Sequence, residues 1–404
     1  MKTKLIIGGL AILVVGAAIG AWATYSFAQN LIMENLPIGT ASLDEKDSYI
    51  KAAPDLNPLK PQKQLKVPSS KAKNVILLIG DGMSISQISA YRLINGGPNS
   101  RISVDKFPYS GIVLTHSENG IVTDSASSAT AYSTGFKTNN TYLGLDANKN
   151  TLENLTETLD RSGYISSLLA TSEITHATPA AFVAHVDLRW KTDEISSQMV
   201  DSNIVTFLGG GRHFFLPEEM GGKREDGRNL LQEVSDSHVL LKTKEEMTNF
   251  DLNLPGRVFG LFADEHIRNI ETPDNHVFEP SLTDMLEFSV NRSDYFIDNG
   301  CTGFFIMAEG SQVDWAGHVN SLDYLNNEMQ DFDSAVDWAL NYAIENSDTL
   351  VVVTADHETG GLLIEPANPV DYSGDKVKFS FNTAVGRGTH TGGSSASLCL
   401  RARC

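Results

Sequence analysis

Residues 75–82 read Val-Ile-Leu-Leu-Ile-Gly-Asp-Gly, an apolar run that ends directly in an acidic residue. A continuous apolar run of this length is typical of a strand buried on both faces, as in a parallel sheet. A helical pattern over residues 84–95 follows it at once. Because a strand followed by a helix is the repeating unit of α/β folds, this stretch predicts a parallel sheet with Asp81 at the carboxyl end of a strand.

The same alternation of apolar runs and helical patterns continues through the chain. We expect strands at 165–171, 205–208, 258–261, 304–307 and 350–353, and a helix at 179–185. Residues 322–345 place apolar side chains at spacings of three and four, which is the stripe of a core-facing helix. We therefore predict an α/β fold, a three-layer sandwich with a central, mostly parallel β-sheet flanked by helices.

Composition sets loose limits on function. The 404 residues are 41% hydrophobic, which suffices for one large domain or two with a sizeable core. The formal net charge of -19 argues against a nucleic-acid-binding surface, because phosphate backbones select basic surfaces. Cys301 is the one cysteine before the last six residues, so we expect no internal disulfide in the folded body and a buried thiol beside the 304–307 strand.

The N-terminal sequence predicts export. Lys2 and Lys4 precede an uncharged run over residues 5–23, and small residues follow as far as Ala28. This is the order of a secretory signal. The run is also near the length that spans a bilayer, so an uncleaved membrane anchor is the alternative. We expect residues 1–28 to be a signal peptide or anchor of an exported protein, periplasmic or extracellular.

Residues 29–72 are expected to be a leader segment. They contain five prolines and show little periodicity, which is typical of a connecting segment and not of a packed core.

Three acidic residues follow predicted strands. Asp81, Glu309 and Asp356 each come at or just after the end of an apolar run. Ligands of open α/β sheets bind beyond the carboxyl ends of the strands. One such acid alone is as often a helix cap or turn residue, but three of them predict a site.

Histidines accompany two of these segments. Asp314 and His318 are four residues apart, so one helical turn places both on the same side, and His357 directly follows Asp356. A mixed set of His and Asp suits zinc, whereas Glu309 and Asp81 with a hydroxyl would form an oxygen-only shell that suits magnesium.

Ser125 is a candidate nucleophile. Asp124-Ser125-Ala126 opens a run of small residues that is expected to begin a helix. A serine in the first turn lies in the positive end of the helix dipole, where phosphate is also favoured. For an isolated Asp-Ser pair a simple N-cap is the more common reading, but the metal-ligating residues elsewhere favour a nucleophile.

Together these segments resemble the bacterial alkaline phosphatases over roughly residues 74 to 393. The matching motifs, in order, are Gly80-Asp81-Gly82-Met83, Thr123-Asp124-Ser125-Ala126, Ala177-Thr178-Pro179-Ala180, Glu309 to His318, Thr354-Ala355-Asp356-His357 and Thr389-His390-Thr391-Gly392. The resemblance implies an alkaline phosphatase catalytic domain over 73–393 that hydrolyses phosphate monoesters. Ser125 would become a transient phosphoserine, which water then hydrolyses. Family members are commonly homodimers, so a homodimer is expected.

The resemblance also implies a set of ligands for each of three metal ions, two zinc and one magnesium. One zinc is expected at Asp314, His318 and His390, and the second at Asp81, Asp356, His357 and the Ser125 oxygen. Asp81 is also expected to bridge to a magnesium held by Thr178 and Glu309. Arg189, after His185-Val186-Asp187-Leu188, matches the family arginine that grips two phosphate oxygens.

Two positions depart from the best-known enterobacterial pattern, and the chain is similar there to cold-active marine and polar relatives. His176 stands where an Asp is found, and Trp315 where a Lys is found. The loss of the Lys removes a cation near phosphate, so we expect weaker phosphate retention and faster product release. His176 either recruits zinc to the third site or packs near it without touching metal.

Residues 394–404 depart from the family pattern. Relatives continue with an apolar closing strand, whereas this stretch reads Ser-Ser-Ala-Ser-Leu-Cys-Leu-Arg-Ala-Arg-Cys. We expect an anomalous tail that lacks the closing strand, which would expose a sheet edge and loosen His390.

Two other functions stay open. A phosphodiesterase or sulfatase could use the same metal core, although such relatives more often have Thr or a modified Cys as nucleophile. An inactive, tethered metal- or phosphate-binding protein is the other possibility, because of the altered C-terminus.

Overall fold

The computed structural model describes residues 50–51, 71–269, 275–367, 376–383 and 389–400. The predicted signal or anchor over 1–28 and most of the 29–72 leader lie outside this described part. Among the described residues, no helix is both long and apolar enough to cross a membrane.

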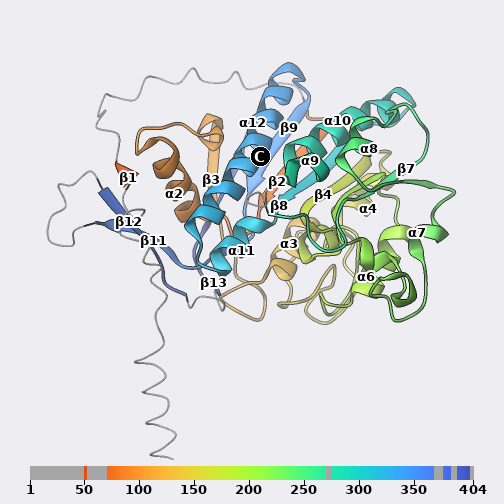
Figure 1. Ribbon diagram of the computed structural model, residues 1–404, viewed down its shortest axis with the longest axis horizontal. Coiled ribbons are helices and arrows are strands. Elements are labelled where there is room, and N and C mark those ends of the chain that lie inside the picture. The colour runs from red at the N-terminus through yellow and green to blue at the C-terminus, as the bar shows by residue number, and fades with distance from the viewer. Residues whose placement is uncertain (1–49, 52–70, 270–274, 368–375, 384–388, 401–404) are drawn as a thin grey trace, which may run out of the picture.

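A nine-stranded sheet forms the centre of the molecule (Figure 1), in the spatial order β3-β14-β9-β2-β8-β4-β5-β7-β6. All pairings from β9 to β6 are parallel, whereas β14 is antiparallel to both of its neighbours. The strands are β2 (Asn74–Gly80), β3 (Tyr109–Val113), β4 (Ile165–Glu173), β5 (Thr206–Gly210), β6 (His238–Leu241), β7 (Arg257–Leu261), β8 (Phe304–Gly310), β9 (Thr349–Thr354) and β14 (Ser395–Cys399). The predicted mostly parallel sheet is confirmed.

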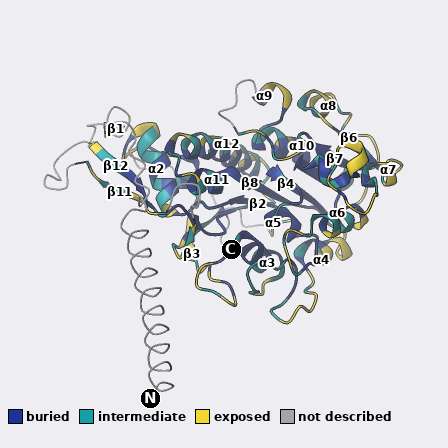
Figure 2. Ribbon diagram, turned by 60° about the horizontal axis from the view of Figure 1, so that its bottom comes forward, coloured by how far each residue is buried: buried dark blue, intermediate teal, exposed yellow. Residues whose placement is uncertain are grey.

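Helices cover both faces of this sheet (Figure 2), which confirms the three-layer α/β architecture. On one face lie α2 (Ile85–Gly96), α8 (Lys244–Thr248), α9 (Asn275–Phe278), α10 (Leu282–Asp298), α11 (Gln312–His318) and α12 (Leu322–Glu345). On the other lie α3 (Ser125–Thr134), α4 (Leu155–Arg161), α5 (Ala177–Ala180) and α6 (Thr192–Asp201). The helix α7 (Leu230–Glu233) and three short 3-10 turns, at Ser103–Lys106, Arg212–Phe215 and Glu218–Met220, complete the list of helical elements.

Alternate residues of the central strands feed two hydrophobic cores. Ile76 and Leu78 of β2 pack with the residues of α10 and α12, whereas Ile79 packs in the core with Phe182 and Ala126 on the other face. The predicted stripe of α12 is buried as expected at Leu325, Met329, Phe332, Val336, Leu340 and Ala343. The two cores hold the sheet between the helix layers, and hydrophobic burial on both faces explains the continuous apolar runs of its strands.

Two smaller sheets extend from the carboxyl end of β9. The two-residue strands β10 (Glu358–Thr359) and β13 (His390–Thr391) pair antiparallel. A separate antiparallel sheet contains β1 (Ile50–Lys51), β12 (Lys376–Phe381) and β11 (Leu362–Pro366).

The expectation that the 394–404 tail lacks a strand is wrong. Residues 395–399 form β14, which lies between β3 and β9 in the main sheet. Cys399 and Leu400 are buried there. The strand forms because backbone pairing to neighbours on both sides compensates for a composition rich in Ser and Ala, whose strand preference is weak. The edge that a missing strand would expose next to β9 is therefore covered.

Two smaller expectations need correction. The predicted helix at 179–185 is reduced to the short α5, because the chain then turns so that Val186 can pair with Leu143. Cys301 is half-buried and packs against the edge of the core, where we expected a buried residue, because it lies in the turn that leads into β8.

Candidate active site

The three strand-end carboxylates converge because their strands are neighbours. In the order β9-β2-β8, Ile79 of β2 lies opposite Thr354 on one side and Glu309 on the other. Asp81 and Asp356 each follow two residues beyond this level, and all three acids are fully buried. The register of three parallel strands thus places three carboxylates in one water-poor region.

The predicted metal ligands form three groups in which the ligand atoms all lie within 4.8 Å of one another. The first group is Asp81, Asp356 and His357, the second is Asp81, Glu309 and His176, and the third is Asp314, His318 and His390. Asp81 belongs to two groups, so one carboxylate connects them. Each group is defined by its side chains alone.

The buried group around Asp81 lacks the hydrogen bonds that buried carboxylates need. His357 Nε2 lies 3.3 Å from Asp81 Oδ1 and 3.2 Å from Asp356 Oδ2. Five buried oxygen atoms of this region have no hydrogen-bond partner among the described residues: both carboxylate oxygens of Asp81, Asp356 Oδ2, Glu309 Oε1 and Thr178 Oγ1. Buried oxygens that converge without donors are costly unless a cation or proton joins them, so this donor set fits divalent metals.

The same burial shifts the ionisation of these acids. Burial raises the pKa of Asp356 to about 6 and that of Glu309 to about 7. Burial, reinforced by the charge of Asp356, raises the pKa of Asp81 well above its usual value. These carboxylates therefore need a positive charge among them to stay ionised, which a divalent cation would supply on binding.

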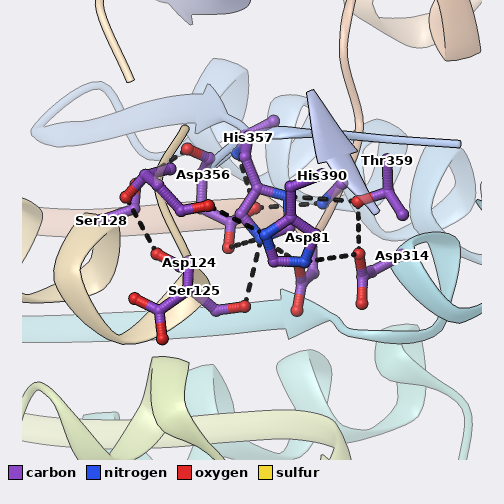
Figure 3. A network of polar contacts seen from close by, with 12 residues as sticks. Asp81, Asp124, Ser125, Ser128, Asp314, Asp356, His357, Thr359 and His390 are labelled. Atoms are coloured by element: carbon purple, nitrogen blue, oxygen red, sulfur yellow. Dashed lines mark hydrogen bonds and ion pairs between the residues drawn. The ribbon is translucent and has the colours of Figure 1, made fainter. Parts of the chain in front are cut away.

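Thr359 fixes the tautomer of His357 (Figure 3). Its hydroxyl donates to Asp314 Oδ1, and the same oxygen lies 3.2 Å from His357 Nδ1. Because the single hydroxyl proton goes to Asp314, the oxygen accepts from Nδ1–H of His357. The Nε2 atom then keeps its lone pair and points at Asp81, Asp356 and Ser125.

The third group is assembled from a helix and a short strand. On α11, His318 Nε2 lies 3.0 Å from Asp314 Oδ2, as the spacing of four residues predicts. His390 lies on β13, and its ring stacks on that of His357 at a centroid distance of 3.6 Å. His390 Nε2 also lies 3.6 Å from Asp314 Oδ1. Its Nδ1 donates to the Thr123 carbonyl at 2.9 Å, which leaves Nε2 available as a ligand.

Charge within this third group favours an ionised Asp314. Burial alone would raise the pKa of Asp314, but the hydrogen bond from His318 and the nearby histidines lower the pKa below its usual range. The two sides of the site therefore differ before any metal binds.

Ser125 lies at the start of α3, at the centre of these groups. Asp124 is the N-cap and accepts a hydrogen bond from Ser127 N at 3.0 Å, as the capping pattern predicts. Ser125 is 2% exposed, and its Oγ lies 3.2 Å from His357 Nε2. The hydroxyl thus stands at the positive end of a helix and next to the buried carboxylates, which suits a nucleophile that attacks an anionic substrate.

Two side chains hold Arg189 beside Ser125. Its Nη1 donates to Asp124 Oδ2 at 3.2 Å, and its Nη2 lies 3.0 Å from His176 Nε2. Burial alone would raise the pKa of Asp124, but Arg189 and the hydrogen bonds from Ser127 and Thr141 lower it. A guanidinium oriented in this way presents a planar donor pair that matches phosphate oxygens.

Several supporting residues give no sequence signal. Gly82 N donates to Asp356 Oδ1 at 3.0 Å, and Ser128 Oγ donates to the Asp356 carbonyl at 2.8 Å. Gly82 has a φ of 71°, and a Cβ there would lie 2.8 Å from Asp314 Cα. Ser311 Oγ donates to Glu309 Oε2 at 2.7 Å. The contacts of Gly82 and Ser128 join segments far apart in the chain, so local patterns could not reveal them.

His176 and Trp315 lie together beside Arg189, with their rings edge to face at 6.1 Å. His266, for which the sequence suggests no role, packs against Trp315 at 4.2 Å and contacts Glu173. Of the other histidines, the side chain of His276 lies outside the described part of the chain.

The chain is similar in sequence and fold to several known proteins. Residues 72–380 match the family model described as alkaline phosphatase. Alkaline phosphatase 4 of Bacillus subtilis is 34% identical over 352 residues, which cover 84% of this chain and 72% of the relative. The repressible alkaline phosphatase of Saccharomyces cerevisiae is also 34% identical. The match covers 74% of this chain and 57% of that relative. The structure of alkaline phosphatase from the Antarctic bacterium TAB5 matches with a TM-score of 0.71 and 32% identity, covering 83% of this chain and 92% of that one.

Proposed function

We propose, since the chain belongs to the alkaline phosphatase family and is a phosphatase, that Ser125 carries out the hydrolysis of phosphate monoesters through a phosphoserine intermediate. The observation that supports this most directly is the position of the Ser125 hydroxyl. It lies 3.2 Å from His357 Nε2, within a group of buried carboxylate oxygens that have no hydrogen-bond partner among the described residues.

In the first step, Ser125 Oγ attacks the phosphorus atom of the ester. The Oγ–P bond forms while the bond from phosphorus to the ester oxygen breaks, and the leaving alcohol takes up the proton that Ser125 loses. Arg189 binds two of the non-bridging phosphate oxygens, and Asp124 and His176 hold its guanidinium in place.

In the second step, a water molecule attacks the phosphoserine. The Oγ–P bond breaks, inorganic phosphate leaves and Ser125 recovers its hydroxyl. The position of Ser125 at the N-terminus of α3 favours the negative charge that develops in both steps.

We assign the ligand groups to two zinc ions and one magnesium ion. Asp314, His318 and His390 would hold one zinc, while Asp81, Asp356, His357 and Ser125 Oγ would hold the other. Asp81, Glu309 and Thr178 would hold the magnesium. Bound metals would lower the pKa of the nucleophile and neutralise charge on the departing oxygen.

The contact between Arg189 and His176 supports magnesium at the third position. Because a guanidinium only donates, His176 Nε2 must accept, and a neutral imidazole then carries its proton on Nδ1. Burial lowers the pKa of His176 well below its usual value, so the ring is neutral. A protonated Nδ1 offers no lone pair to a metal, which leaves an oxygen-only shell.

A steady-state assay of the purified protein tests the proposal. We expect release of phosphate from an aryl phosphate, loss of this activity on chelation, recovery with zinc plus magnesium, and at least about a 1,000-fold loss in Ser125→Ala. Activity towards a diester or sulfate ester that exceeds the monoester activity would instead favour the alternative hydrolases. Metal binding without turnover would indicate an inactive binding protein.

Trapping of the intermediate provides a second, independent test. Brief incubation with labelled substrate and acid quench should leave phosphate on Ser125 of the wild type, whereas Ser125→Ala should not be labelled.

We also propose export and a homodimeric state. Export is supported by Lys2, Lys4 and the apolar run over 5–23, and dimerisation by the family resemblance. Localisation of a tagged full-length chain and sedimentation velocity of the protein would test these two proposals.

A further inference from the structure

A cavity of about 220 Å³ lies next to Arg189, and of its lining residues the proposed chemistry uses only Arg189 and His176. Four aromatic rings line it, those of His176, Trp190, Trp315 and His266. Because Arg189 also contacts Asp124, the residue before Ser125, the cavity adjoins the expected position of the phosphate group.

Trp190 is exposed at the wall of this cavity although its backbone is held in place. Its indole is 68% exposed. The turn around it is closed by Lys191 N, which donates to the Leu188 carbonyl at 3.0 Å, and Arg189 N donates to the Thr141 carbonyl at 2.9 Å. The ring therefore contributes little to the core while it presents a large apolar surface next to the candidate site.

The other rings are fixed by their neighbours. His266 packs against the indole of Trp315 at a centroid distance of 4.2 Å and an interplanar angle of 60°. His176 approaches the same indole edge to face at 6.1 Å. Trp315 follows Asp314 directly on α11, so its position is tied to that of the third ligand group.

The cavity also has a polar part. Thr175 is 1% exposed, and its Oγ1 has no hydrogen-bond partner among the described residues. Glu173, which also lines the cavity, contacts His266 Nδ1. A buried hydroxyl without a partner next to aromatic walls is what a cavity offers to a ligand with a polar substituent.

We infer that this cavity binds the alcohol portion of the substrate when that portion is a planar aromatic ring, so that the preferred substrates are aryl phosphates. The inference rests on the proposed function, since it places the phosphate group at Arg189 and Ser125. Aromatic rings gain stacking or edge-to-face energy from the indoles and imidazole, whereas an alkyl chain gains only burial.

The size of the cavity favours a single ring. A cavity of about 150 Å³ accommodates benzene, so 220 Å³ holds one substituted ring and leaves little space for a second ring system. A sugar followed by a base would extend out of it. A preference for nucleotides over phenyl phosphate would therefore contradict the inference.

The steady-state kinetics of two variants, Trp190→Ala and Trp190→Phe, test this inference. The substrates are phenyl phosphate and glycerol phosphate. The comparison of each variant with the wild type removes the different intrinsic reactivities of the two esters. We expect Trp190→Ala to lower kcat/KM for phenyl phosphate about 3- to 10-fold, as expected for one aromatic contact. Glycerol phosphate should change less than about twofold, and Trp190→Phe should restore most of the loss.

Phe136→Ala provides a matched control. Phe136 is another exposed aromatic residue, 62% exposed, but it follows the far end of α3 and does not line the cavity. This variant should leave the ratio of the two kcat/KM values unchanged.

The outcomes of these experiments decide the inference. A loss confined to phenyl phosphate supports it, whereas equal losses for both esters, or no loss for either, would overturn it. A change in sedimentation of Trp190→Ala would place Trp190 in a contact between copies and also overturn it. Failure of the wild type on both esters would reject the proposed function itself, which separates that failure from a failure of the cavity assignment.

Discussion

The two candidate zinc groups have similar ligands but very different surroundings. Asp81, Asp356 and His357, which we call the inner group, are all fully buried. In the outer group, Asp314, His318 and His390, the aspartate is buried but both histidines are partly accessible, with the His318 side chain 35% exposed. The inner group comes from the ends of adjacent parallel strands, whereas the outer group needs a helix and the two-residue strand β13.

The difference indicates how each group is kept in place. The long strands β2 and β9, with helices on both faces, fix the inner group. The outer group depends on the pairing of β13 with β10 and on single hydrogen bonds such as that from His390 to Thr123. We therefore expect the inner metal to be held firmly and the outer metal to exchange more easily with solvent.

The largest effect is expected from Asp356→Asn in the inner group. The substitution removes one negative charge and one metal-ligating oxygen from a fully buried site, so activity should fall at least about 1,000-fold. Kinetics and metal content measured on the same sample would show the loss. Excess zinc should not restore activity. Full rescue by zinc would show that the inner group does not hold its metal more firmly than the outer group does.

The pH dependence of stability should reveal the inner group in the metal-free protein. The pKa of Asp356 is raised from 3.8 to about 6, and that of Glu309 from 4.5 to about 7, both chiefly by burial. The folded chain therefore holds these protons more tightly than the unfolded chain does. The resulting stability is fully present below about pH 4 and is lost as pH rises through 6 and 7, by on the order of 3 kcal/mol.

Thermal unfolding of chelator-treated protein between pH 4 and 8 would measure this loss. Glu309→Gln should reduce this pH-dependent loss of stability. With metals bound, stability should instead rise with pH, because the ligands must be deprotonated. Because the lowered pKa values of buried histidines such as His176 and His357 make stability rise with pH over the same range, the loss is measured as the difference between wild type and Glu309→Gln. A difference that does not change between pH 4 and 8 would contradict the prediction.

A smaller effect is expected from His390→Ala in the outer group. Asp314 and His318 remain as ligands, so activity should fall about 100-fold and excess zinc should restore part of it. A titration of activity with zinc would measure the rescue. If zinc restored the activity of Asp356→Asn but not that of His390→Ala, the outer group and not the inner one would hold its metal more firmly.

The smallest effect is expected from Trp315→Lys, next to the outer group. A lysine there adds a cation near the phosphate position, so inhibition by inorganic phosphate should strengthen by a few-fold, on the order of 1 kcal/mol. The inhibition constants of inorganic phosphate for the wild type and for Trp315→Lys would measure this change. An unchanged constant would show that Trp315 does not govern product release.

The sequence predicts the inner part of the site better than the outer part. Asp81 and Asp356 directly follow continuous apolar runs, and the register of parallel strands leaves little freedom in where such residues lie. Asp314 and His318 could also be placed, because their spacing matches one helical turn. Their roles as metal ligands stay predictions.

Contacts between distant segments could not be predicted. Thr359 bonds Asp314, and His266 packs on Trp315, only because the folded chain brings separate loops together. The strand β14 was missed for a different reason. Its Ser- and Ala-rich sequence has little strand preference of its own, and pairing on both sides determines its conformation.

The place of β14 between β3 and β9 has a consequence for the order of folding. Within the described part of the chain, β3 contacts the main sheet only through β14, and the two strands are separated by about 280 residues of sequence. Closing so long a loop is slow, and β3 cannot dock before β14 has done so. We therefore expect β3 to be the last strand to gain protection from amide hydrogen exchange during refolding, well after the parallel strands that carry the inner group.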